Sequence, residues 1–281
     1  MKERTSKMRL ATWRIIILMF AGLIAANVSS SLMAQSEEEP TEAQLDTSEL
    51  APDPAAIIER LAEEMGGRMV LAGLTEYQID CTVTYSGGVY DWIVKQQNDN
   101  RFISQQEGAG LYLTDGKQRW QNINSGGWEE SDKSTAWQSN NTFPHPVTVV
   151  RWLESTEQFE FVQSTTITNP VTEEEFQVDQ IKKVNDLGSE MLYSFDKQSG
   201  LLVHYRNTPD EIQTSLGKSA RNCFLKYDEF DGQLCFSDYW GEYQDSYLHI
   251  KTDTVNWEPE FPEGTFPPIP VKLEEGPDAD Q

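Results

Sequence analysis

The chain has 281 residues and a mass of 32.0 kDa, and 38% of its residues are hydrophobic. That is enough apolar material for one substantial core, or at most two small ones. A mean hydropathy of -0.57 excludes a membrane protein with several spans. The formal charge of -24 makes nucleic acid and anionic lipid surfaces poor partners. Three cysteines are too few for a disulfide scaffold or a four-thiolate zinc site.

The N-terminal segment, residues 1–34, has the pattern of a signal peptide. Five basic residues precede an uncharged run whose densest apolar part is shorter than a membrane span of about 20 residues. Small residues follow, and we expect cleavage near Ala34 or Gln35, with an uncleaved membrane anchor as the alternative. No cysteine precedes Cys81, so a lipobox is absent. The sequence therefore predicts a periplasmic or secreted protein without stable membrane insertion after cleavage.

Two acidic segments flank the predicted folded domain, residues 54–273. Residues 35–53 contain seven acidic residues and no basic one, and residues 274–281 contain four more acidic residues. Such segments have little to bury and repel themselves, so we predict a disordered linker and a disordered tail. Without residues 1–34 the chain keeps 17 basic and 45 acidic residues. We interpret this charge as a solubilising surface.

The folded domain is expected to begin with one short amphipathic helix. Asp53 can cap it, and Pro54 suits its first turn. Gly66-Gly67 ends the pattern. The apolar face of this helix consists of Ile57, Ile58, Leu61, Ala62 and Met65.

Most of the remaining chain has the pattern of β-strands. Residues 77–85 alternate apolar and polar side chains, which is typical of a half-buried strand, and Asp115-Gly116 marks a hairpin. Turn signals recur every 8 to 14 residues or so, so the sheet should be antiparallel and meandering. Long aromatic-rich strands with one apolar face, together with a single amphipathic helix, predict that the sheet is curved. Residues 134–153 interrupt this rhythm, and Pro146 favours a short helix there over a strand. Further strands are expected within 90–94, 101–103, 110–113, 118–120, 159–161, 176–178, 191–195, 201–205, 223–229, 234–240 and 247–255.

No catalytic motif stands out. The sequence contains no glycine-rich phosphate loop, no G-x-S-x-G nucleophile elbow and no H-E-x-x-H. His145, His204 and His249 are widely spaced, so we predict neither a metal site nor a cofactor. Two carboxylates would suffice for a glycosidase, but 45 acidic residues nominate no particular pair. We therefore expect a protein that is not an enzyme.

The cysteines can be placed by hairpin geometry. If Asp231-Gly232 is a two-residue turn, Cys235 lies opposite Asp228, and Cys223 is an odd number of residues from Asp228. The two thiols would then point to opposite sides of the sheet, which argues against a disulfide between them. Cys81 lies on the apolar face of its strand, which predicts a buried thiol.

Two hairpins resemble those of the LolA/LolB-like superfamily of periplasmic lipoprotein carriers. Residues 112–120 (YLTDGKQRW) look like the family's "DGK…W" hairpin, and residues 193–202 (YSFDKQSGLL) look like its "D-x-x-T/S-G-L" hairpin. Residues 255–257 (VNW) with 266–268 (FPP) are similar to the end of that domain. The resemblance covers roughly residues 54–270. It implies an unclosed antiparallel barrel, with helices on its concave face, that shelters acyl chains.

The predicted function is therefore the binding of a lipid, acyl chain or other hydrophobic ligand, in envelope lipoprotein or lipid transport. The alternatives are an envelope structural or interaction protein, and a secreted glycan-binding β domain that uses its tryptophans as stacking platforms. Alternation identifies an apolar face but leaves open whether that face is a packed core or a cavity. The candidates for this inner face are Tyr77, Ile79, Val83, Tyr85, Trp92, Phe102, Trp120, Phe159, Phe161, Phe195, Leu225, Tyr227 and Phe236.

Overall fold

The computed structural model describes residues 51–85, 88–97, 101–106, 110–114, 118–122, 127–130, 141, 143–184, 188, 190–208, 222–243 and 246–268. The predicted signal peptide, most of the predicted linker, the predicted tail and the Asp115-Gly116 turn lie outside these residues. Within the described residues, no helix is long and apolar enough to span a bilayer.

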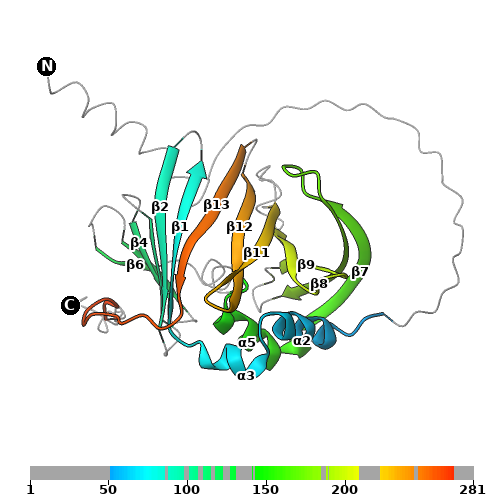
Figure 1. Cartoon of the computed structure of the whole chain (residues 1–281), viewed down its shortest axis with the longest axis horizontal. Coiled ribbons are helices and arrows are strands. Elements are labelled where there is room, and N and C mark those ends of the chain that lie inside the picture. The colour runs from blue at the N-terminus through cyan, green and yellow to red at the C-terminus, as the bar shows by residue number, and fades with distance from the viewer. Residues whose placement is uncertain are drawn as a thin grey trace, which may run out of the picture.

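A single sheet forms most of the fold (Figure 1). Its 13 strands run in the order β6-β5-β4-β3-β2-β1-β13-β12-β11-β10-β9-β8-β7, and the two end strands do not pair with each other. The expected mainly β architecture, a curved antiparallel sheet that does not close into a barrel, is confirmed. The strands are β1 Tyr77–Tyr85, β2 Gly88–Gln96, β3 Phe102–Gln106, β4 Gly110–Thr114, β5 Arg119–Asn122, β6 Glu129–Glu130, β7 Phe159–Thr168, β8 Glu175–Val184, β9 Glu190–Asp196, β10 Leu202–Thr208, β11 Asn222–Phe230, β12 Gln233–Tyr243 and β13 Ser246–Asn256.

The strands form where the sequence alternates, and a tight turn joins β11 to β12. In β1 every second residue from Tyr77 to Val83 is buried, as its alternation predicts. Between β11 and β12, Asp231 and Gly232 both have positive φ (49° and 82°). This is the backbone that a two-residue hairpin turn requires.

Helix α2 (Pro54–Glu64) forms as predicted. The Asp53 carboxylate accepts a hydrogen bond from the Ala55 N–H, and Pro54 occupies the first turn. Two glycines with positive φ, Gly66 and Gly67, end this helix. They lead into a second short helix, α3 (Arg68–Gly73), which the sequence did not predict because six residues are too few for a periodic pattern.

Residues 134–153, which interrupt the predicted strand pattern, lie in the connection between the two edge strands of the sheet. Strands β6 and β7 are consecutive in sequence but lie at opposite edges, so the chain must cross the whole sheet between them. The expected helix is confirmed as α5 (Pro146–Glu154), followed by a 3-10 turn, η1 (Thr156–Gln158). Helices α2, α3 and α5 contact one another and lie together below the strands in Figure 1. We call the face of the sheet that packs against these helices the inner face.

Arg60 fastens α2 to the β9–β10 turn. Its guanidinium donates to the Lys197 carbonyl at 2.9 Å and to the Gln198 carbonyl at 2.8 Å. Gly200 closes the same turn with a φ of +75°, and a Cβ there would lie 2.8 Å from the Arg60 side chain. The turn therefore needs glycine for both its backbone and its approach to α2.

We expect Gly200→Ala to lower the free energy of unfolding by about 2 kcal/mol. The control is Gly264→Ala, where φ is +84° but a Cβ would meet nothing within 4 Å. That variant should lose only about 1 kcal/mol, the cost of a positive φ. Urea titration measures both losses. The excess at Gly200 should disappear in an Arg60→Ala background, and an unchanged excess there would contradict the contact.

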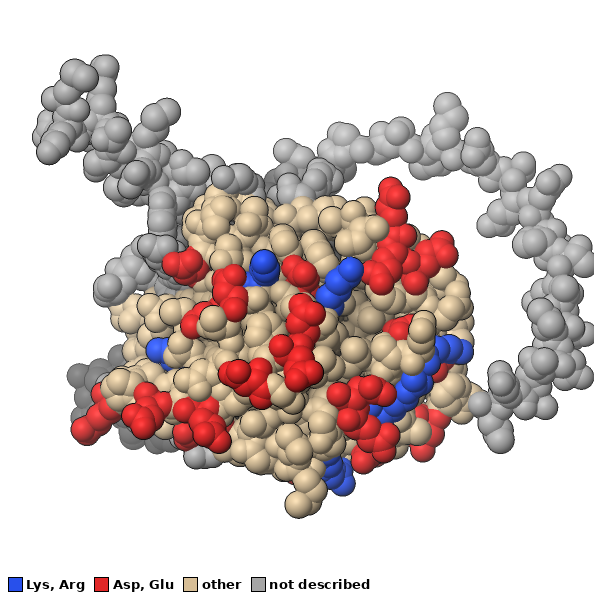
Figure 2. All heavy atoms as spheres, viewed as in Figure 1, with Lys and Arg blue, Asp and Glu red and all other residues tan. Residues whose placement is uncertain are grey.

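Acidic side chains dominate the face of the molecule shown in Figure 2, and basic side chains are few. Some lysines are paired, for example Lys182 with Glu160 at 3.1 Å and Lys226 with Glu174 at 3.1 Å. These pairs are exposed, so each contributes little to stability.

Candidate functional site on the inner face of the sheet

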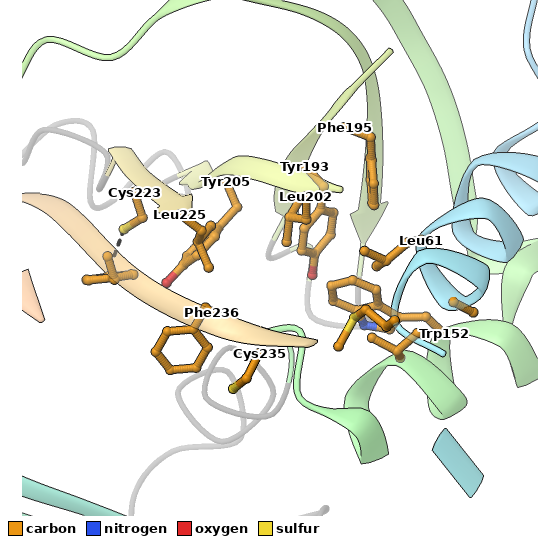
Figure 3. Packing of buried hydrophobic residues seen from close by; sticks show 14 of the residues in the cluster. Leu61, Trp152, Tyr193, Phe195, Leu202, Tyr205, Cys223, Leu225, Cys235 and Phe236 are labelled. Atoms are coloured by element: carbon orange, nitrogen blue, oxygen red, sulfur yellow. Dashed lines mark hydrogen bonds between the residues drawn. The ribbon is translucent and has the colours of Figure 1, made fainter. Parts of the chain in front are cut away.

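Most of the predicted inner-face residues lie together in one buried cluster, which we call the main core. The main core joins the inner face to the helices: in Figure 3 Leu61 of α2 and Trp152 of α5 lie opposite Tyr193 of β9. Of the predicted residues, Tyr77, Ile79, Val83, Phe159, Phe195, Leu225 and Phe236 are buried in the main core, and Trp92, Phe161 and Tyr227 are partly buried against it.

Trp120 is on the other side of the sheet, contrary to expectation. Trp120 belongs to a row of paired residues on neighbouring strands, which continues through Leu113, Ile103 and Lys95 to Gln78 of β1. Paired residues on neighbouring strands point to the same face of a sheet. Gln78 lies between two residues of β1 that point inward, so this whole row, including Trp120, points outward. Trp120, Leu113 and Ile103 form a second cluster with Phe266, which we call the outer cluster. In this part of the sheet the outer face is also covered by apolar residues.

Two further candidates lie outside the main core. Tyr85, at the end of β1, is only partly buried and belongs to neither cluster. Phe102 lies in β3, where its backbone pairs with Gln96 and Thr114, but its side chain is outside the described part of the structure.

Phe143, which the sequence analysis missed, covers the centre of the inner face. It stacks on Phe236 with ring centroids 5.3 Å apart and lies 5.2 Å from Tyr239. Its ring is also 5.6 Å from that of Trp92 and 6.4 Å from that of Tyr205. These four neighbours come from three strands, β2, β10 and β12. Phe143, in the segment that leads into α5, therefore fills a concave aromatic surface. No periodic pattern marks Phe143, because it belongs to no helix or strand.

His145 lies beside Phe143 in the same surface. Its ring centroid is 5.5 Å from Phe143, 5.5 Å from Tyr77 and 5.6 Å from Phe236. Burial among these rings disfavours the imidazolium and lowers the pKa of His145 to about 3. The histidine is therefore neutral at physiological pH.

Asn141 joins the crossing chain to the sheet. Its side-chain oxygen accepts hydrogen bonds from Trp152 Nε1 at 3.2 Å and from Lys183 Nζ at 3.3 Å, and its carbonyl accepts from the Tyr193 hydroxyl at 3.0 Å. Lys183 also lies 3.4 Å from the Ser155 hydroxyl, at the C-terminal end of α5. Burial lowers the pKa of Lys183 to about 8. A cation at a helix C-terminus is favourably placed, which offsets part of the cost of burial.

All three thiols are buried and free. Burial raises the pKa of Cys81 to about 12 and raises that of Cys235 as well, so neither thiol is activated as a nucleophile. The predicted pairing of Cys235 with Asp228 across the hairpin is confirmed. Cys223 and Cys235 are both buried in the main core.

The histidines lie in different surroundings. His204 contacts Ser194 Oγ at 3.2 Å, and His249 contacts Asp238 Oδ1 at 2.8 Å, while the ring of His145 packs against Phe236 of the main core. Within the residues that the structure describes, no group of three His, Cys, Asp or Glu side chains could hold a metal ion.

Most of the tryptophans contribute to packing. Among the described ones, Trp240 alone lies outside both clusters, and it stacks on His249 with centroids 5.4 Å apart. Trp137 lies outside the described residues. The other tryptophans, Trp92, Trp120, Trp128, Trp152 and Trp257, pack within or against a cluster, so the described part of the chain offers few stacking platforms for a glycan.

No protein-family model and no curated protein matches the chain. Among solved structures, a DUF1329 family protein from Desulfovibrio piger ATCC 29098 aligns over 76% of this chain and 98% of its own, with a TM-score of 0.50 and 10% identity. A LolA superfamily protein from Nitrosomonas europaea aligns over 77% and 98%, with a TM-score of 0.49 and 9% identity. A putative outer membrane lipoprotein-sorting protein domain from Vibrio parahaemolyticus aligns over 75% and 97%, with a TM-score of 0.40 and 9% identity. At 10% identity the likeness to the DUF1329 family protein is one of fold alone, and the fold is an antiparallel sheet that does not close into a barrel, as the resemblance of the two hairpins implied.

Proposed function

We propose that the protein is an exported, non-enzymatic binder of a lipid, acyl chain or other hydrophobic ligand, and that the ligand lies against the inner face. The observation that supports this proposal most is the position of Phe143. A single side chain from outside the regular structure covers an aromatic surface made by Trp92, Tyr205, Phe236 and Tyr239. An apolar ligand makes the same kind of contact as this ring, so it can take its place.

The fold supports the same proposal. A curved sheet with an apolar concave face can shelter acyl chains, as the resemblance of the two hairpins to the LolA/LolB-like superfamily implies. Export is proposed from residues 1–34, and transport of lipids or lipoproteins in the envelope is the process in which such a binder would act.

The test uses a probe of defined chemistry, 1-anilinonaphthalene-8-sulfonate, and two matched variants. Phe143→Ala opens space against the aromatic surface, and an apolar cavity of this kind takes up apolar molecules. We expect this variant to bind the probe about tenfold more tightly than the wild type. The control, Phe266→Ala, removes an equally large ring from the outer cluster and should leave probe affinity within about twofold.

Native mass spectrometry of the protein purified from a periplasm without detergent complements this titration. A lipid-sized adduct that organic extraction removes supports the proposal, and the protein mass reports whether residues 1–34 have been cleaved. A bare protein that binds no probe even as Phe143→Ala would contradict it. The inner face would then be a packed core, and the interaction-protein alternative would gain support.

A further inference from the structure

The two edges of the sheet differ greatly in length. One edge is β6, which has only two residues, Glu129 and Glu130. The other edge is β7, which has ten residues and pairs only with β8 among the described strands. In Figure 1, β7 forms the outer margin of the sheet at the right. A long edge strand presents a row of unpaired backbone N–H and C=O groups, which is a template for another strand.

The composition of β7 does not protect this edge. Residues 162–168 (VQSTTIT) contain no charged residue and no proline, in a chain where 24% of residues are charged. Five of the seven are β-branched and favour extended backbone. Val162 is 43% exposed. Sheet proteins usually guard an edge with lysine, proline or a very short strand. β7 has none of these three features, but an irregularity lies near its beginning, between Phe161 and Gln163, and helix α2 contacts this strand.

Hydrogen bonds to β8 hold β7 in a fixed position. Gln163 Nε2 donates to Gln180 at 2.9 Å, and the Ser164 hydroxyl donates to Asp179 at 2.6 Å. Thr166 Oγ1 accepts from a Gln177 amide at 2.7 Å. These polar side chains of β7 therefore point to its existing partner and fix its register. The side of β7 that faces away from β8 is therefore held in an extended conformation. A segment that pairs with this side does not have to order β7 first.

Charge at the two ends of β7 determines which partner fits. Glu157 and Glu160 lie at its beginning, and residues 173–175, three consecutive glutamates, lie in the turn beyond its end and at the start of β8. All five are exposed, and two of them are already paired, Glu160 with Lys182 and Glu174 with Lys226. An antiparallel second copy would place the acidic beginning of one β7 against the acidic end of the other, twice, and the like charges would repel. A segment with an uncharged centre and basic residues at both ends has the complementary pattern.

We propose that the outer edge of β7 is a docking site for an extended segment of a partner protein, with an uncharged β-branched centre flanked by lysine or arginine. The segment adds to the sheet as a further antiparallel strand. Main-chain hydrogen bonds provide affinity, and the glutamates at the two ends provide selectivity. This site lies at the margin of the sheet and is independent of the ligand site on the inner face.

The experiment measures fluorescence anisotropy of labelled synthetic peptides against the full chain. The first probe is a twelve-residue peptide with a Thr/Val centre and two lysines at each end, and the second replaces the lysines by glutamates. We expect the lysine peptide to bind at least about tenfold more tightly at low salt, with an affinity that falls as salt is added. A third probe, N-methylated at alternate residues on the docking side, cannot donate main-chain hydrogen bonds and should lose binding.

Two valine variants locate the site. Val162→Lys introduces a like charge on the edge itself, and we expect it to weaken binding of the lysine peptide at least about tenfold. Val89→Lys is the control, because Val89 is also an exposed strand valine (66% exposed) but lies on β2 in the interior of the sheet. It should bind as the wild type does. Three outcomes would overturn the proposal: equal binding of the N-methylated peptide, equal losses in both variants, or a β7-dependent dimer that excludes the peptide.

Discussion

Replacing Trp152 by alanine is expected to lower the free energy of unfolding by about 3–5 kcal/mol. Trp152 is fully buried and lies edge-on to Tyr193 with centroids 4.9 Å apart. Its indole N–H also donates to Asn141. Truncation therefore leaves a cavity between α5 and the sheet and removes a hydrogen bond from the residue that holds the crossing chain in place.

Urea titration followed by circular dichroism measures this loss. Trp152→Phe separates its two parts, since it keeps most of the apolar volume but removes the N–H, and should lose less than the alanine variant. Trp240→Ala is the matched control, because Trp240 lies outside both clusters, and it should lose at most about 1 kcal/mol. Equal losses at the two tryptophans would show that the crossing chain does not hold the core together.

The second large effect is a loss of stability in acid that depends on His145. Its pKa is about 3 in the folded protein, against an ordinary value of 6.5. Between pH 6.5 and about 3, His145 is therefore protonated in the unfolded chain and neutral in the folded protein. The free energy of unfolding should fall by about 1.4 kcal/mol per pH unit as the pH drops from 6.5 toward 3, and His145 should contribute no slope above 6.5.

The measurement is urea titration of the wild type and of His145→Leu at several pH values between 7.5 and 4. Carboxylates titrate in both proteins, so the informative quantity is the difference between them. The variant should become more stable relative to the wild type as the pH falls through this range. Curves that stay parallel would contradict a buried neutral histidine. Below pH 3 the difference should level off, because both states are then protonated.

The sequence predicted most of the fold because the signals that specify it are local. Alternation from Tyr77 to Val83 identified β1, Asp231-Gly232 identified a hairpin, and Pro146 identified the start of α5. In each case one backbone preference or one buried face determines the element. Helix α3 was missed because its six residues carry too few positions to show a period.

The candidate site was predicted less completely. Segments that are distant in the sequence determine what packs against each face of the sheet. Trp120 lies on the outer face, which Phe266 of the C-terminal segment covers at that point. Phe143 lies in a connection, where no period exists to reveal that its ring covers the inner face. Alternation states which residues share a face, and only the tertiary structure states what lies against it.

The pairing of β1 with β13 has a consequence for the order in which the protein can fold. Every other pair of neighbouring strands is consecutive in sequence, whereas Gln78 of β1 pairs with Asn256 of β13. Each of the two meanders, β1–β6 and β7–β13, can form from local contacts, but the join between them closes the longest loop in the molecule. A chain in which β13 has not yet formed holds two separate meanders. The inner face, which takes residues from both, comes into existence only when the last strand arrives.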